Sequence, residues 1–229
     1  MNRLAKPMRP IARHSGITYI YRIACKLQTQ DFHQMPNQLL HYISDYSGQS
    51  LSAAEAALIK SMFQVKKMRK RQFFLQAGDE CTDVAFIVKG AMRQYRTSEK
   101  GTKSIVQLGI ENWWVGDRSS FSLAQPSIYN IDAWEHTELN VISRKGVLQL
   151  IENSPAFAKM VRVMDERHAG ATQERISGYN LLTADQRYAS FSERYPELAS
   201  RFPLHVIASY LGMTKETLSR IRAASKTGK

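Results

Sequence analysis

The sequence predicts an α+β fold in which a β-roll is followed by a long helix and then by a C-terminal helix-turn-helix. From about residue 65 to residue 145, short runs rich in β-branched and aromatic residues alternate with turn signals, which is typical of a β-sandwich or β-roll. From residue 147 onward, apolar residues recur at three- and four-residue steps, as they do in helices. Residues 203–223, PLHVIASYLGMTKETLSRIRA, contain two short helical patterns separated by one glycine.

The composition is that of a folded protein with a strong positive charge. The 229 residues, of which 43 % are hydrophobic, are enough for one large or two modest domains with their own cores. The formal net charge of +12 favours polyanionic partners, with nucleic acid ahead of an anionic membrane. Two cysteines are too few for a disulfide framework, an iron–sulfur cluster or a zinc site, and they fit a cytoplasmic protein. No stretch approaches the ~20 apolar residues that span a bilayer, so no membrane partner is predicted.

Residues 1–34 are a basic N-terminal extension. Against the one acidic residue, Asp31, this segment carries Arg3, Lys6, Arg9, Arg13, Arg22 and Lys26. Two interpretations stay open: a disordered tail that orders only on a partner, or an extension from start-site choice, with the natural protein beginning at Met35. We favour the second.

The β-region follows two predicted helices within residues 35–63. Ser52 followed by Glu55 resembles a capping box at the start of the second helix. The predicted strand runs are RQFFLQ, DVAFIVKG, AMRQYRT, KSIVQLGI, NWWVG, YNIDAWE and ELNVIS. Gly90, between two of these runs, predicts a tight turn where a side chain would not fit. We interpret the basic run KKMRKR at 66–71 as a solvated strand edge.

A long helix follows the β-region. A short helix ends near Asn153, and Pro155 then opens a helix that runs to about Leu182 and would be ~40 Å long. Its apolar stripe comprises Phe157, Met160, Val161, Met164, His168 and Ala171, and continues with Ile176, Tyr179 and Leu182. Such a stripe packs against a partner helix or covers the β-roll of its own chain, and both can hold, one for each end. A further helix is predicted over residues 183–198, with Thr183 as its cap.

The C-terminal pattern agrees with a helix-turn-helix at each structural position. Ala208 is the small residue where the second helix crosses the first, and Gly212 tolerates the positive φ of the turn. Thr214 supplies an N-cap for the second helix. The positions expected to be buried are Ile207, Leu211, Met213, Leu218 and Ile221. The exposed positions at the start of the second helix, from which side chains can reach base edges or phosphates in a major groove, are Lys215, Glu216, Ser219 and Arg220. An ordinary helical hairpin is the alternative, and it explains less of this pattern.

On these residues the chain resembles the Crp/Fnr family of bacterial transcription regulators over about residues 38–223. MTKETLSRI is similar to that family's recognition-helix motif, with its Arg/Lys-Glu-Thr-x-x-Arg core, and FFLQAGDECTDVAFIVKGAMRQYR resembles the strands of its effector domain. The resemblance implies a cyclic-nucleotide-binding-like β-roll (a double-stranded β-helix), a dimerisation helix and a DNA-binding head. It implies Lys215, Glu216 and Arg220 as base readers. The phosphate contacts it implies are Thr214, Thr217 and Ser219.

The domain organisation and the partners follow from this resemblance. The expected parts are the extension 1–34, an effector-binding-like domain with flanking helices at 35–154, the dimerisation helix at 155–182 and the helix-turn-helix domain at 183–229. The head lacks a full wing, because only AASKTGK remains after Arg222. The implied partners are double-stranded DNA with a palindromic operator, a second copy of the chain in a homodimer, and RNA polymerase as a further candidate.

The expected effector pocket departs from the pattern of the cyclic-nucleotide members. Those members hold the ribose with a Gly-Glu pair and the phosphate with an Arg-Ser or Arg-Thr pair, whereas this chain has Gly116–Asp117 and Ser127–Ile128. A cyclic phosphate without a guanidinium lacks its bidentate partner, which argues against cAMP as a cofactor. Arg118 or Arg93 could substitute. The pocket otherwise binds an unidentified small-molecule effector or nothing.

Other classes of protein explain the sequence less well. A cupin-like enzyme needs a cluster of histidines and carboxylates for a metal, and His136 is the one histidine between residues 42 and 167. Neither a phosphate-cradling glycine loop nor HExxH or GxSxG occurs, so we predict no catalytic residues, no metal site and no enzyme. A sensor or interaction module without DNA binding stays the main alternative. Membrane association through residues 1–34 is a third.

Overall fold

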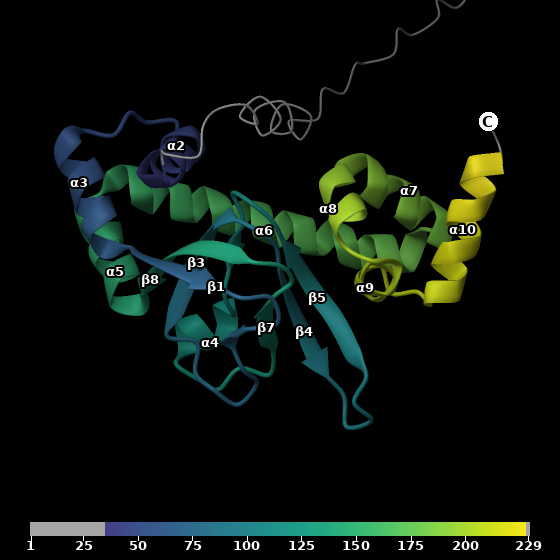
Figure 1. Cartoon of the computed structure of the whole chain (residues 1–229). Helices are drawn as coiled ribbons and strands as arrows, with labels where there is room; N and C mark the ends of the chain where they lie inside the picture. The colour runs from purple at the N-terminus through teal and green to yellow at the C-terminus, as the bar shows by residue number, and fades with distance from the viewer. Residues whose placement is uncertain (1–34, 228–229) are drawn as a thin grey trace, which may run out of the picture. The chain divides into compact units, whose positions relative to one another are not determined.

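The β-region of this computed structural model, which describes residues 35–227, forms two antiparallel four-stranded sheets (Figure 1). The prediction for residues 1–34 lies outside the described residues. One sheet has the order β1 (Gln64–Met68), β8 (Thr137–Ser143), β3 (Asp83–Lys89), β6 (Trp114–Val115). The other has the order β2 (Phe73–Leu75), β7 (Asn130–Ala133), β4 (Met92–Thr97), β5 (Lys103–Gly109). The predicted β-roll is confirmed, and we call residues 64–143 the roll.

Side chains from both sheets form the interior of the roll. Ala85 and Ile87 of β3 are buried in one cluster with Met92 of β4 and Leu139 of β8. Gly90 turns the chain from β3 into β4 with φ 104°, and a Cβ there would lie 2.5 Å from the Thr137 Oγ1 atom. The predicted tight turn is therefore confirmed, with the close approach of β8 as its physical reason.

Strand β1 lies at the end of its sheet and is largely exposed. It pairs with β8, from Gln64 opposite Val141 to Met68 opposite Thr137, and four of its five residues face solvent. Lys67 forms an ion pair with Glu138 at 3.4 Å. The basic run at 66–71 is thus a solvated strand edge, as the sequence predicts.

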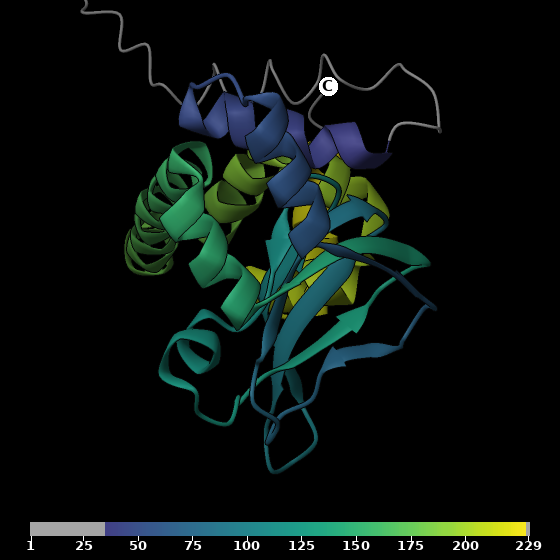
Figure 2. The ribbon, with the colours of Figure 1, turned by 90° about the vertical axis from the view of Figure 1, so that its left-hand side faces the viewer.

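Five helices of the described chain accompany the roll. They are α2 (Met35–Ser47), α3 (Ala53–Met62), α4 (Arg118–Leu123), α5 (Arg144–Asn153) and α6 (Pro155–Leu181). Leu39 and Ile43 of α2 are buried in one cluster with Phe157 and Met160 of α6, and Figures 1 and 2 show the two helices side by side. No helix within residues 35–227 is long and apolar enough to cross a membrane.

Local capping signals explain where several helices begin. The Ser52 side chain accepts from the Glu55 N–H, and the Glu55 side chain accepts from the Ser52 N–H, which is the predicted capping box of α3. Ser154 caps α6, and Pro155 occupies its first position, where the missing N–H costs nothing. Thr183 caps α7, as expected.

The C-terminal head consists of four helices: α7 (Ala184–Arg194), α8 (Pro196–Arg201), α9 (Leu204–Tyr210) and α10 (Lys215–Thr227). The prediction of one helix over residues 183–198 is wrong, because the chain leaves the helical conformation at Tyr195, with φ −134° and ψ 60°. Proline disfavours the α conformation in the residue before it, so Pro196 ends α7 and opens α8.

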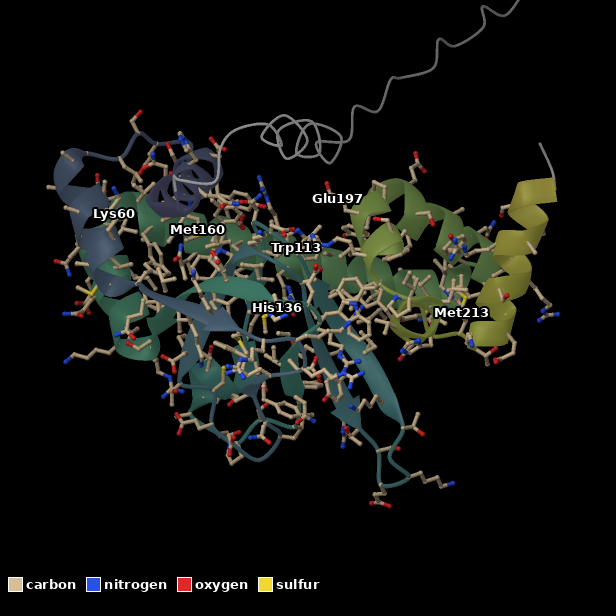
Figure 3. All side chains as sticks on the ribbon, in the orientation of Figure 1. Lys60, Trp113, His136, Met160, Glu197 and Met213 are labelled. Atoms are coloured by element: carbon tan, nitrogen blue, oxygen red, sulfur yellow. The ribbon has the colours of Figure 1, made fainter. Side chains whose placement is uncertain are left out.

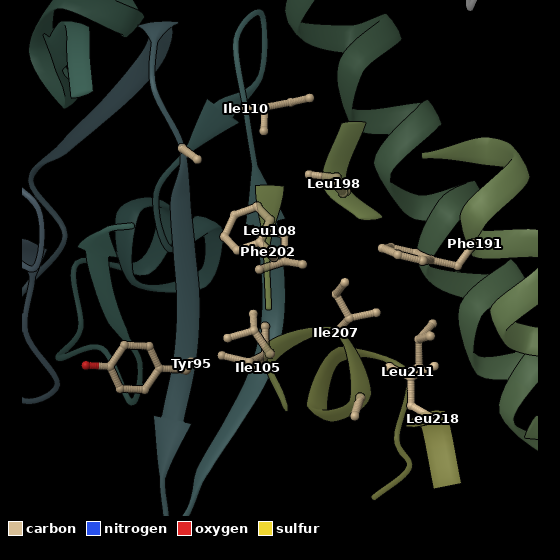
Figure 4. Packing of buried hydrophobic residues seen from close by; sticks show 13 residues of the cluster. Tyr95, Ile105, Leu108, Ile110, Phe191, Leu198, Phe202, Ile207, Leu211 and Leu218 are labelled. Carbon is tan, nitrogen blue, oxygen red and sulfur yellow. The ribbon is translucent and has the colours of Figure 1, made fainter. Parts of the chain in front are cut away.

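The roll and the head share one buried apolar cluster (Figure 4). Its members from the roll and the β5–β6 connection are Ala91, Tyr95, Ile105, Leu108 and Ile110, and its members from the head are Phe191, Leu198, Phe202, Val206, Ile207, Ala208, Leu211 and Leu218. Trp113, labelled in Figure 3 between the roll and α8, meets Tyr195 edge-on with ring centroids 5.7 Å apart. One outer face of the β4–β5 hairpin is therefore covered by the helices that carry the candidate site.

Candidate nucleic-acid interface and effector segment

Helices α9 and α10 meet in the geometry expected of a helix-turn-helix. Gly212 has φ 65°, which favours glycine, and its N–H donates to the Ser209 carbonyl at 3.2 Å. The Met213 N–H donates to the Ala208 carbonyl at 3.0 Å and closes the turn. The Thr214 Oγ1 accepts from the Thr217 N–H at 3.1 Å and caps the start of α10.

The two helices bury the predicted apolar positions and expose the polar ones. Ala208 and Leu218 are buried where the helices cross. Ile207, Leu211 and Ile221 are also buried, and Met213, beside the start of α10 in Figure 3, is partly buried. The exposed residues at the start of α10 are Thr214, Lys215, Glu216, Ser219 and Arg220, and Thr217 is half-buried. The structure thus brings all six predicted DNA contacts onto one end of one helix.

An ion-pair cluster joins the head to the roll, and sequence reasoning missed it. Arg201, at the end of α8, contacts Glu111 and Glu135, with 2.7 Å between its Nη2 atom and the Glu135 Oε1 atom. Burial by itself would raise the pKa of the Glu111 carboxyl, but hydrogen bonds from Arg201 and from the Gly90 N–H outweigh it, so the pKa lies below its ordinary value. Arg201 is 66 positions from Glu135 and 90 positions from Glu111 in the chain, so no local sequence pattern predicts their contact.

The predicted effector residues also come together, in residues 116–128, which we call the effector segment. Gly116 follows β6, and Asp117 is the N-cap of α4, where its Oδ1 accepts from the Ser119 and Ser120 N–H groups. The Ser127 hydroxyl donates to the Asp117 Oδ2 at 2.7 Å. Asp117 is 5 % exposed and Ser127 is 3 % exposed, so this hydrogen-bonded group is buried. Both carboxylate oxygens of Asp117 are thus engaged by the segment itself.

The other two predicted effector residues, Arg118 and Ile128, lie outside this buried group. Arg118 forms an ion pair with Asp165 of α6, and Ile128 is exposed. Burial lowers the pKa of His168, one turn further along α6, and the positive charges of Arg118 and Arg175 lower it further.

Two arginines outside the segment bind other groups of the same chain. Arg93 makes a bidentate pair with Asp132 at 2.7 and 2.8 Å. Burial opposes the charge of Arg93, but the Asp132 carboxylate outweighs it and raises the pKa of Arg93. Arg144, which sequence reasoning missed, donates to the Phe121 carbonyl at 2.6 Å and so holds the end of α4. Within the described part of the chain, no group of three or more His, Cys, Asp or Glu could hold a metal ion.

Comparisons with known proteins agree with this fold. Residues 65–154 match the cyclic nucleotide-binding domain family. The chain is 28 % identical over 167 residues to the anaerobic regulatory protein of Aggregatibacter actinomycetemcomitans, an alignment that covers 68 % of this chain and 64 % of that protein, which is less than two thirds of its length. The structure of FixK2 from Bradyrhizobium japonicum superimposes with a TM-score of 0.64 at 19 % identity, over 72 % of this chain and 85 % of that one. A Crp/Fnr-family structure from Eubacterium rectale superimposes with a TM-score of 0.56 at 20 % identity, over 78 % and 85 % of the two chains.

The fold and the matched domain define a protein with a cyclic-nucleotide-binding-like roll, a long helix and a C-terminal helix-turn-helix. The related proteins are regulators by name. The chain is therefore similar in sequence to an anaerobic regulatory protein, and similar in fold to a solved structure of the Crp/Fnr family.

Proposed function

We propose that this protein is a homodimeric, sequence-specific DNA-binding transcription regulator. The exposed face at the start of α10 carries the proposal. Lys215, Glu216 and Arg220 have the donor and acceptor groups that read base edges, and Thr214, Thr217 and Ser219 have hydroxyls suited to phosphates. The net charge of +12 supports a polyanionic partner.

A homodimer is supported by the surface of α6. The first half of this helix is buried against its own chain through Phe157 and Met160. The second half exposes large apolar side chains, with Ile176 at 54 % and Leu181 at 78 % exposure. A second copy of α6 can cover this surface by two-fold symmetry, and two heads related in this way read a palindrome. We accordingly assign 35–154 to the effector-like domain, 155–182 to dimerisation and 183–229 to DNA binding.

The effector segment supports a pocket that is not built for cAMP. Ser127 occupies the position of the phosphate-binding arginine, and its hydroxyl donates a hydrogen bond to Asp117. Asp117 in turn has both oxygens engaged, and Arg93 is committed to Asp132. These residues do not fit a cyclic nucleotide held through its ribose and phosphate. Arg118, paired with Asp165 near the protein surface, is the remaining candidate for contact with an anionic effector.

The wider setting is that of a regulator in the cytoplasm, with RNA polymerase as a further partner. Related proteins that are regulators by name support this, as does the low cysteine count.

Selection of the purified protein against a random duplex library, without added nucleotide and at near-physiological salt, tests the proposal. We expect enrichment of a palindrome, bound with an affinity that falls steeply with salt because phosphate contacts release counterions. A second selection with cAMP should enrich the same sequence equally well. If neither selection enriches any sequence and duplex binding is absent at low salt, the chain is instead a sensor or interaction module without DNA binding.

A further inference from the structure

Two consecutive residues at the end of α9 are held by two different parts of the chain. The Ile105 N–H of β5 donates to the Ser209 Oγ at 3.0 Å, and this hydroxyl contacts the Lys103 carbonyl at 3.3 Å. The Tyr179 hydroxyl of α6 donates to the Tyr210 carbonyl at 2.7 Å. We call these contacts the α9 junction. The roll and the long helix therefore meet on neighbouring residues of the helix-turn-helix.

Each bond of the α9 junction satisfies a backbone group that its own element leaves open. Strand β5 is at the end of its sheet and pairs with β4, so its outward N–H groups need partners from elsewhere. Ser209 provides one for Ile105. The last carbonyls of a helix likewise have no partner within the helix, and the Tyr179 hydroxyl provides one for Tyr210. Each contact joins one side chain to a backbone group, so each has only one mobile side chain and defines the position of α9 more closely than a contact between two side chains.

The ring of Tyr179 also lies against the turn that leads into α10. A Cβ at Gly212 would be 2.8 Å from the Tyr179 Cε1 atom. Gly212 is only three residues before Lys215, the first residue of α10. The ring of Tyr179 thus defines how closely the turn approaches α6, and with it where α10 begins.

Arg175, one turn earlier on α6, strengthens the same connection. Its guanidinium donates to the Val106 carbonyl of β5 at 2.5 Å and lies 5.5 Å from the centroid of the Tyr210 ring. A single side chain of α6 therefore contacts both β5 and α9. Together with the shared apolar cluster, this arrangement leaves α9 little freedom to tilt relative to the roll.

We propose that Tyr179 and Ser209 are positioning residues, which set the orientation of α10 relative to α6 and β5. This inference depends on the proposed function. In a two-fold dimer built along α6, the spacing and angle of the two α10 helices follow from how each is fixed to its own α6. A tilt of α10 disturbs base contacts on both half-sites at once. Non-specific binding depends on attraction to the phosphates and not on this orientation, so it persists when α10 tilts.

The first test separates specific from non-specific binding in Tyr179→Phe and Ser209→Ala. We expect the dissociation constant for the selected palindrome to rise about three- to tenfold in each variant, which is the range for losing one hydrogen bond. The dissociation constant for an unrelated duplex, and the melting temperature, should stay close to wild type. Tyr129→Phe and Ser200→Ala remove the same hydroxyl groups in the roll and on α8, and should change neither constant.

A second test follows the junction without DNA. The Ile105 amide is bonded to Ser209, so hydrogen exchange at this amide reports directly on the docked α9. We expect about tenfold faster exchange in Ser209→Ala, and no change in Ser200→Ala. If wild type shows slow exchange at Ile105 but no sequence preference, the proposed function fails while the junction stands.

Two outcomes overturn the inference. In one, both variants keep wild-type affinity for the palindrome, so orientation does not depend on these residues. In the other, specific and non-specific binding fall together with the melting temperature, so the two residues only stabilise the fold. A wild type that binds the palindrome is the reference for either result.

Discussion

At the residue scale, the Ser127 hydroxyl links the two ends of the effector segment through its hydrogen bond to Asp117. Replacing Ser127 with alanine leaves one oxygen of the buried Asp117 carboxylate without its donor. We expect the free energy of unfolding to fall by about 1–3 kcal/mol, the cost of an unsatisfied buried group. Urea denaturation measures this change. Ser122, exposed on α4, is the matched control, and Ser122→Ala should lie within about 0.5 kcal/mol of wild type. Equal stability of the two variants would show that the hydroxyl of Ser127 is dispensable.

Arg220 is the residue whose proposed role in DNA binding can be tested most directly. It is exposed on α10, one helical turn after Glu216. If it reads a base, Arg220→Ala should cost about 1–3 kcal/mol at one base pair of each half-site and relax the sequence preference there. Competition binding with single-base variants of the selected palindrome measures this. Uniform weakening on all duplexes, with a smaller salt dependence, would instead make Arg220 a phosphate contact.

Gly212 combines a conformational and a steric requirement. Its φ of 65° is strained for a β-branched residue, and any Cβ meets the ring of Tyr179. Gly212→Val should therefore abolish specific binding and lower stability by about 2 kcal/mol or more. Gly101→Val, at a positive φ in the open β4–β5 turn, separates the two effects, because no atom lies within 4 Å of a Cβ there. Specific binding retained by Gly212→Val would contradict the placement of the turn.

At the element scale, the ends of helices were predictable and the contacts between elements were not. Ser52, Thr183 and Thr214 cap helices through bonds that span three residues, so the sequence contains both partners within one short window. The break at Tyr195 is a local signal of the same kind, which the apolar pattern of residues 183–198 obscured.

The partners in the effector segment and the α9 junction depend on the folded topology. Sequence reasoning placed Asp117 and Ser127 in one pocket through the family resemblance, but their mutual hydrogen bond is a matter of geometry. Ser209 and Ile105 are 104 positions apart, and a serine at the end of a helix has no pattern that predicts a strand as its partner. Exposed residues of α10 were predictable because one helix face follows directly from spacing.

The ion-pair cluster between Arg201 and Glu111 makes the attachment of the head dependent on pH. The pKa of Glu111 is lowered in the folded protein, so the stabilisation is present above the unfolded pKa and is lost as pH falls through the folded value. Glu111→Gln should lower stability by about 1 kcal/mol at pH 7, and the difference from wild type should shrink below about pH 4. Denaturation at several pH values measures this. Glu99→Gln, at the exposed β4–β5 turn, should show no difference at any pH. A difference for Glu111→Gln that is constant with pH would mean that its charge is not involved.

At the scale of the whole molecule, the described chain is organised around α6. One end of this helix is buried with α2 and α5, its middle contacts the effector segment through Asp165, and its far end holds the α9 junction through Tyr179. The head and the roll also share one apolar cluster. A change at the effector segment therefore has a continuous physical connection to α10. In the proposed dimer, a change in how the two copies of α6 pack would move both heads together.

The proposed dimer can be tested through the exposed apolar surface of α6. Ile176 is 54 % exposed on the second half of α6, where two copies related by a two-fold axis would bury it twice. Ile176→Glu removes about 1.5–3 kcal/mol of apolar burial from each copy and places two carboxylates at the interface, so the dissociation constant of the dimer should rise about a hundredfold or more. Sedimentation equilibrium measures this constant directly. Leu148→Glu on α5 is the matched control, because Leu148 is 55 % exposed and lies away from α6's second half, and it should remain dimeric. A monomeric wild type would contradict the homodimer itself. An Ile176→Glu variant that is as dimeric as wild type would place the dimer contact elsewhere, and the half-site spacing selected from the duplex library would then have to come from a different pairing of the heads.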